Sequence, residues 1–155
     1  RDVALKTVVD SDAEDAPLLR RFVSEARITA QLQHQNVVPV HEFGATEDGR
    51  LFFVMARLGG DTLKAVLEAV REGEGEAERR WTRHRLLSAF LQVCNAVSYA
   101  HSRGVLHRDL KPSNVMLGRY GEVSVVDWGL ARFTGSGPEK SVARALDEGG
   151  GGPQL

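Results

Sequence analysis

The stretch HRDLKPSN, residues 107–114, decides how the rest of the chain is interpreted. It begins just after a long helical pattern that ends near residues 102–104, where Gly104 is typical of a helix stop. Two short strand-like pieces follow it, at 114–117 and 123–127. The chemically active groups of the chain are concentrated in this stretch: the carboxylate of Asp109, the ammonium group of Lys111 and the amide of Asn114.

The stretch resembles the catalytic loop of protein kinases, and seven of its residues agree with the HRDLKPxN form. The resemblance implies that Asp109 accepts or orients the proton of a substrate hydroxyl and that Lys111 reaches the transferring phosphate. It also implies that Asn114 ligates Mg²⁺ through an oxygen atom without adding a negative charge. Lys111 followed by Pro112 is the serine/threonine form of the loop, so the expected partner is a protein with a Ser or Thr hydroxyl.

Asp127-Trp128-Gly129 resembles the metal-binding DFG motif of the same family and starts thirteen residues after Asn114. The resemblance implies that Asp127 is a second Mg²⁺ ligand. Tryptophan in place of phenylalanine departs from the family pattern. The departure bears on the flip between active and inactive forms, and metal binding is expected to be kept. Taken alone, an aspartate before a glycine would indicate only an ordinary turn.

Val3-Ala4-Leu5-Lys6 resembles the VAIK strand of kinases, whose lysine holds the α- and β-phosphates of ATP. Glu25, on the next predicted helix, fits the glutamate that pairs with this lysine. Taken alone, Lys6 would be an exposed strand lysine and Glu25 a solvated helix carboxylate. Their order relative to the other motifs favours the paired interpretation.

Three further stretches resemble the family: HQNVV at 34–38, LFFVMARLGGDTL at 51–63 and AHSRGVLHRDLKPSN at 100–114. The second corresponds to the strand and hinge that hold the adenine ring. The resemblance implies that Met55 is the gatekeeper, that the backbone from Ala56 to Leu58 faces adenine, and that Ala4 and Met116 sandwich the ring. It covers residues 1 to about 133, and the stretch 114–132 is most like bacterial kinases of the eukaryotic type.

Hydrophobic periodicity and turn residues predict the elements. Strands are expected at 3–9, within 34–45 and at 51–58, and helices from Pro17, over 63–70 and through 86–97. Asp61 or Thr62 is expected to cap the second helix, and 71–80 is expected to be a solvated loop or a frayed helix end. The expected class is therefore α+β.

The resemblance implies an incomplete two-lobe kinase fold. The expected division is a partial N-lobe at 1–58, a partial C-lobe at 59–133 and a mobile, truncated activation segment at 134–155. The glycine-rich phosphate loop and the APE segment of the family are missing from the sequence, so the isolated fragment is expected to be inactive.

Composition limits the other classes of function. The 155 residues are 42% hydrophobic and 26% charged with a formal net charge of -1, which argues against nucleic-acid binding through bulk positive charge. Cys94 is the single cysteine and excludes an internal disulfide, which is typical of a reducing compartment. No apolar run suits a membrane helix. A cytoplasmic location is therefore expected, with an anchor outside this segment left open.

Two other classes stay open at this point. A pseudokinase scaffold would keep the fold and nucleotide binding without transfer, although Lys6, Glu25, Asp109, Asn114 and Asp127 are all present. A small-molecule phosphotransferase of the aminoglycoside type shares the fold but usually lacks the Lys-Pro pair. Arg108 indicates regulation by a phosphate in the activation segment, for which Thr134, Ser136 and Ser141 are candidate acceptors and none of the three stands out.

Overall fold

The computed structural model describes residues 2–8 and 16–134. The expected activation segment beyond Thr134, with Ser136 and Ser141, lies outside the described residues.

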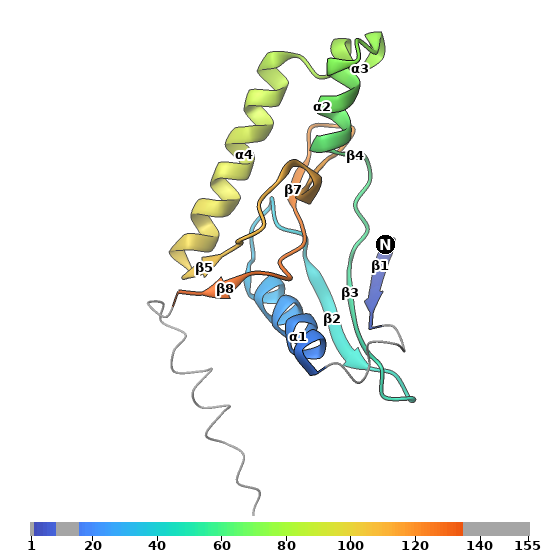
Figure 1. Cartoon of the computed structure of the whole chain (residues 1–155), viewed down its shortest axis with the longest axis vertical. Coiled ribbons are helices and arrows are strands. Elements are labelled where there is room, and N and C mark those ends of the chain that lie inside the picture. Colours follow the sequence, from blue (N-terminus) through green and yellow to red (C-terminus); the bar gives the residue numbers. More distant parts are fainter. Residues whose placement is uncertain (1, 9–15, 135–155) are drawn as a thin grey trace, which may run out of the picture.

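The first part of the chain is a three-stranded antiparallel sheet with a helix beside it (Figure 1). The strands lie in the order β1 (Val3–Thr7), β3 (Leu51–Ala56) and β2 (Val40–Ala45). Helix α1 (Ala16–Gln31) packs Phe22 and Ala26 into a buried cluster with Val8 and Phe53. Pro17 lies in the first turn of α1, as predicted, because its missing N–H has no partner to lose there.

The second part contains short strands and most of the helices. The helices are α2 (Leu63–Arg71), α3 (Gly75–Arg80), α4 (Arg83–Ser102) and the 3-10 helix η2 (Pro112–Asn114). The strands are β4 (Asp61–Thr62), β5 (Val105–Leu106), β6 (Val115–Leu117), β7 (Val123–Val125) and β8 (Arg132–Phe133). Strands β4, β6 and β7 form one sheet, and β5 pairs with β8. The HRDLKPSN stretch therefore connects two small sheets.

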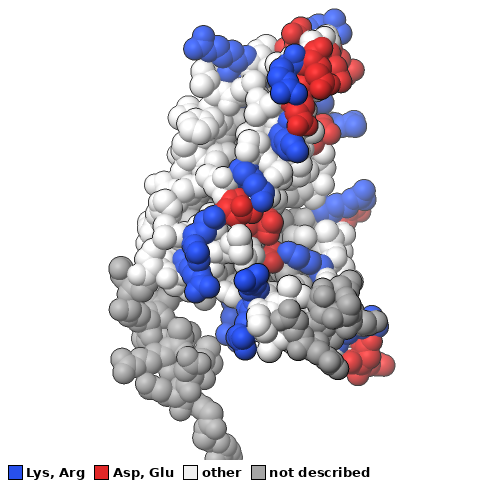
Figure 2. All heavy atoms as spheres, viewed as in Figure 1, with Lys and Arg blue, Asp and Glu red and all other residues white. Residues whose placement is uncertain are grey.

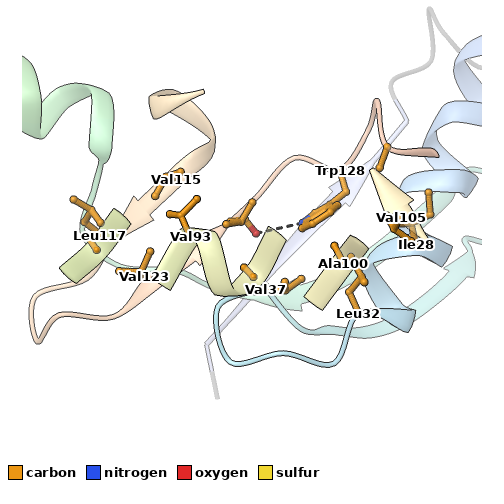
Figure 3. Close-up of a cluster of buried hydrophobic side chains, with 14 of the residues drawn as sticks. Ile28, Leu32, Val37, Val93, Ala100, Val105, Val115, Leu117, Val123 and Trp128 are labelled. Atoms are coloured by element: carbon orange, nitrogen blue, oxygen red, sulfur yellow. Dashed lines mark hydrogen bonds between the residues drawn. The ribbon is translucent and has the colours of Figure 1, made fainter. Parts of the chain in front are cut away.

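Helix α1 also joins the larger of the two buried clusters (Figure 3). Its residues Ile28 and Leu32 pack there with Val93 and Ala100 of α4 and with Trp128. Trp128 is 1% exposed and is among the largest fully buried side chains. The helix that carries Glu25 is thus held by both clusters, which fixes Glu25 relative to the Asp127-Trp128-Gly129 segment.

The hinge after β3 depends on a glycine and a cap. Gly60 has φ +98, and a Cβ atom there would lie 2.1 Å from the carbonyl oxygen of Leu117, so only glycine allows this close approach. The Thr62 hydroxyl accepts a hydrogen bond from the Ala65 N–H at 3.1 Å and caps α2. Of the two residues that the sequence allowed for the cap, the structure selects Thr62.

The prediction for residues 71–80 was wrong, because a separate short helix, α3, covers Gly75–Arg80. Glu76 and Glu78 lie in its first turn and Arg79 and Arg80 in its last, which suits the helix dipole at both ends. Trp81, 8% exposed, follows and packs into the larger cluster. The many charged residues of this segment are equally typical of a solvated loop, so the sequence did not reveal the helix. The two-residue strands β4, β5 and β8 were not predicted either.

Helix α4 forms where predicted, but its buried face consists of Ala89, Val93, Ala96 and Ala100. These small side chains let β7 approach the helix closely. Leu87, Phe90 and Leu91, by contrast, are 54%, 60% and 62% exposed, and the α4 side of the molecule carries few charges in Figure 2. Among the described residues, no helix has the length and hydropathy to span a bilayer.

Candidate active site

Lys6 and Glu25 form an ion pair between β1 and α1. The Lys6 Nζ lies 2.6 Å from the Glu25 Oε1, and the side chains are 40% and 11% exposed. The ammonium group also lies 5.7 Å from the centroid of the Phe53 ring. A carboxylate so little exposed needs a charged partner, and Lys6 supplies it. Glu25 points inward because it belongs to the buried face of α1, together with Phe22 and Ile28.

His107 is a structural support of the loop. It is 4% exposed, accepts the Asp109 N–H at Nδ1 (3.3 Å) and lies with Nε2 3.1 Å from the Val126 carbonyl oxygen. Because Nδ1 accepts, Nε2 carries the proton and donates it to Val126. Burial lowers the pKa of the His107 imidazole, so the neutral ring is the form that the fold holds.

Two polar side chains of the loop, those of Lys111 and Asn114, converge on Asp109. Lys111 Nζ lies 2.7 Å from Asp109 Oδ2, and Asn114 Nδ2 donates to Asp109 Oδ2 at 3.1 Å and to its carbonyl oxygen at 2.9 Å. The hydrogen bond from Lys111 is the main reason that the pKa of the Asp109 carboxyl is lowered, so this group is ionised at neutral pH. Because Asn114 is bonded through its nitrogen, its Oδ1 is left as the acceptor.

Asp127 lies beyond the end of β7, with an exposed side chain and a backbone φ of 61°. Arg108 has φ 67°. A positive φ is uncommon for residues other than glycine, so the neighbouring contacts must hold both conformations. A Cβ atom on Gly129 would lie 3.2 Å from both Asp127 Oδ1 and Glu25 Oε2. The two carboxylates therefore approach the same glycine, one from each part of the chain.

A cavity of about 330 Å³ lies between the β1–β3 sheet and β6–β7. Eight of the predicted site residues line it: Ala4, Lys6, Glu25, Met55, Ala56, Leu58, Met116 and Asp127. Asp109, Lys111 and Asn114 are not in its lining, but the Asn114 carbonyl accepts the Val126 N–H at 3.0 Å, next to Asp127. The HRDLKPSN stretch thus lies beside the Asp127 end of the cavity.

Sequence reasoning missed part of the lining. Thr29, Val38, Phe53, Val126 and Trp128 also face the cavity. Thr29 is one helical turn after Glu25 and donates its hydroxyl proton to the Glu25 carbonyl at 2.8 Å. Spacing from Glu25 could have identified Thr29, whereas Val38 and Phe53 carry no chemical signal that distinguishes them from core residues.

Comparison with known proteins agrees with these features. The family model described as "Protein kinase domain" matches residues 1–146. Serine/threonine-protein kinase PknD of Protochlamydia amoebophila (strain UWE25) is 36% identical over 152 residues, which are 96% of this chain and 15% of that protein. PknD of Chlamydia pneumoniae is 42% identical over 134 residues, 84% of this chain and 14% of that protein. PknD of Chlamydia muridarum is 41% identical over 154 residues, which are 97% of this chain and 16% of that protein.

The chain spans about 15% of the length of the first of these relatives. Its sheet, with α1 and the helical second part, is consistent with part of a protein kinase fold. The match covers the lysine strand, the HRDLKPSN stretch and the Asp127-Trp128-Gly129 segment. This chain therefore belongs to the protein kinase family.

Proposed function

We propose that this chain carries the nucleotide-handling and phosphoryl-transfer centre of a serine/threonine protein kinase. The reaction is transfer of the ATP γ-phosphate to a Ser or Thr hydroxyl of a protein. The observation that carries the proposal is the approach of Glu25 and Asp127 to Gly129 at the cavity that Lys6 also lines, with the Asp109 loop beside it. The relatives named serine/threonine-protein kinase support the substrate class.

The cavity suits a nucleotide because its two ends differ in chemistry. Ala4, Met55, Leu58 and Met116 line it with apolar atoms, which suit a flat aromatic base. At the end of β3, the Ala56 and Arg57 N–H groups donate to the Pro39 and Asp2 carbonyl oxygens, so the Leu58 N–H is the amide donor available to the edge of that base. At the other end, Lys6 supplies an ammonium group for phosphate oxygens, and Glu25 holds it in place at 2.6 Å.

The donor set fits Mg²⁺. Asp127 offers an exposed carboxylate and Asn114 a free amide oxygen, and hard cations of this kind prefer such oxygen ligands. Within residues 2–8 and 16–134, no group of three or more His, Cys, Asp and Glu side chains could hold a metal alone. An ion held by Asp127 and Asn114 would take its other ligands from phosphates and water. When bound, it supplies charge neutralisation at the phosphate oxygens.

Asp109 is the group that receives the substrate. Its Oδ2 is bonded to Lys111 and Asn114, so Oδ1 is the oxygen that orients the attacking hydroxyl and takes its proton. Lys111 is 50% exposed, so its pair with Asp109 breaks at little cost when a phosphate needs the ammonium group. These side chains position the reacting groups and stabilise their charge, and phosphoryl transfer requires little else from a protein.

Regulation by phosphorylation is part of the proposal. A hollow of about 560 Å³ between α1 and β8 is lined by Arg20, Arg21 and Arg132, and no acidic residue among those that the structure describes lines it. Guanidinium groups bind phosphate through paired hydrogen bonds. A phosphate on the activation segment that occupied this hollow would tie α1, and with it Glu25, to the segment after Asp127. Arg108 is exposed and remains a further candidate for this contact.

The remaining expectations stay proposals. We retain the division into an N-lobe part at 1–58, a C-lobe part at 59–133 and an activation segment from 134. The proposed partner is a protein substrate, with no role for nucleic acid and a cytoplasmic setting for this segment.

The test is phosphate transfer from Mg–ATP to a mixed Ser, Thr and Tyr substrate by the longest natural polypeptide that contains this segment. Phosphoserine or phosphothreonine in the product supports the proposal. Phosphotyrosine alone would overturn the substrate class. Nucleotide binding without transfer to any hydroxyl would favour a pseudokinase scaffold instead.

A further inference from the structure

A hollow of about 340 Å³ lies between the hinge, residues 57–60, and the hairpin of β6 and β7. The proposed reaction does not use this outer hinge hollow. Leu58 and Met116 line both the hollow and the proposed nucleotide cavity, so the two spaces adjoin at the adenine end. Lys6, Glu25 and Asp127 line the cavity and not the hollow. The outer hinge hollow is therefore separate from the groups proposed to handle phosphate and metal.

Backbone contacts fix the shape of the outer hinge hollow. Strand β4 follows the hinge and pairs with β6, with Asp61 opposite Leu117. Gly60 lies so close to the Leu117 carbonyl oxygen that no side chain fits between them. The Gly118 N–H donates to the Glu122 carbonyl at 2.8 Å and closes the hairpin. Because both walls are held in this way, a ligand meets a hollow that is already formed, which reduces the cost of ordering on binding.

Two exposed arginines, Arg57 and Arg119, line the outer hinge hollow. Within residues 2–8 and 16–134, no ion pair joins either guanidinium group to a carboxylate. Glu122 also lines the hollow, but its Oε2 accepts the Tyr120 N–H at 2.8 Å within its own turn. The two guanidinium groups therefore remain available to an anionic partner, and carboxylates bind such groups through paired hydrogen bonds.

The lining of the outer hinge hollow is also apolar. Leu58 and Met116 are half-buried and offer side-chain surface to an occupant. Tyr120 adds an aromatic ring that is 92% exposed. A free anion would leave these apolar surfaces uncovered, whereas a peptide with an apolar residue next to Asp or Glu would match both features. A volume near the lower end of the range for ligand pockets suits a few side chains of such a peptide.

We propose that the outer hinge hollow docks an acidic segment of the protein substrate that also carries an apolar side chain. This inference rests on the proposed kinase function. Carboxylates of the segment pair with Arg57 and Arg119, and the apolar side chain packs on Leu58 and Met116. Because the hollow adjoins the nucleotide cavity, docking raises the local concentration of a Ser or Thr hydroxyl of the same substrate near Asp109.

The first experiment measures binding of a short fluorescein-labelled peptide that alternates aspartate and leucine, by fluorescence anisotropy, to the longest natural polypeptide that contains the segment. Arg119→Glu should weaken binding by about tenfold or more, because repulsion replaces a charge-assisted contact. Gly59→Leu should weaken it as well, by placing a side chain in the hollow. Gly59 lines the hollow, and a Cβ atom there would meet no atom within 4 Å, so the variant is expected to fold.

Arg83→Glu is the matched control, because Arg83 is exposed at the start of α4 and does not line the hollow. It should bind the peptide as the parent protein does. The peptide should also stay bound in saturating Mg–ATP, and loss of binding there would place it in the nucleotide cavity and overturn the inference. Parent-like affinity in folded Arg119→Glu and Gly59→Leu proteins would overturn it too, as would equal binding of a lysine–leucine peptide or no binding at millimolar peptide.

A second readout connects docking to phosphate transfer. An acceptor peptide with Ser and Thr, joined by a flexible linker to the aspartate–leucine segment, should have a KM at least about tenfold below that of the acceptor alone, with kcat unchanged. Arg119→Glu should remove this difference and leave the KM of the acceptor alone as in the parent protein. Equal KM values for the two substrates in the parent protein would exclude a docking role. If neither substrate is phosphorylated, the kinase proposal fails, while the anisotropy result still decides whether the hollow binds an acidic segment.

Discussion

Glu25→Gln tests whether the charge of the Lys6–Glu25 pair organises the cavity. Glutamine keeps the size and an acceptor oxygen but removes the charge. A hydrogen bond between charged groups contributes about 1.5–3 kcal/mol and a neutral one about 0.5–1.5 kcal/mol, so the loss is about 1–2 kcal/mol. Lys6 is 40% exposed and partly screened by water, which places the expected loss near the lower end, about 1 kcal/mol.

The assay is urea unfolding together with ATP titration, in the longest natural polypeptide that contains the segment. One kcal/mol corresponds to about a fivefold weaker constant, so we expect the KM for ATP to rise about fivefold or more. Glu68→Gln is the matched control. Its pair with Lys64 is 3.9 Å long with both side chains at least half exposed, and its loss should cost less than about 0.5 kcal/mol. Equal effects of the two substitutions would refute the reasoning.

Three further predictions follow from single features. Burial lowers the pKa of His107, so its contribution to stability is complete above the ordinary value of 6.5 and is lost as the pH falls below it. In the His107→Gln protein, the free energy of unfolding measured in urea should therefore change less between pH 7.5 and 5.5, and the same pH dependence as in the parent protein would contradict this. Gly60→Ala should cost about 2 kcal/mol or more, because the new Cβ would lie 2.1 Å from the Leu117 oxygen, while Gly59→Ala, with no atom within 4 Å, should be nearly neutral by the same measurement. Arg21→Ala with Arg132→Ala should abolish any rise in activity on activation-segment phosphorylation, and a rise equal to that of the parent protein would exclude their hollow as the phosphate site.

The main elements of the fold could be predicted because local patterns determine them. Pro17 sets the start of α1, a threonine caps α2, and apolar periodicity marks α4. The buried face of α4 could not be predicted, since packing selected the alanines and left larger side chains such as Phe90 exposed. The short helix α3 was missed because its stabilising charges also suit a solvated loop.

The candidate site was predictable where a residue carries distinctive chemistry at a family spacing. Lys6, Glu25 and Asp127 are examples, and they line the same cavity. Supporting residues gave no such signal. The hydrogen bond of the Trp128 indole depends on the position of the Val125 carbonyl, and the lowered pKa of His107 depends on its burial. Both are properties of the tertiary structure.

The most direct test of the central claim is γ-phosphate transfer from Mg–ATP to a protein substrate with and without Asp127→Ala, measured in the longest natural polypeptide that contains the segment. A metal-ligating carboxylate supports several kcal/mol of transition-state stabilisation, so transfer should fall by more than about a hundredfold while the protein stays folded. Transfer at the parent rate by a folded Asp127→Ala protein would contradict the account.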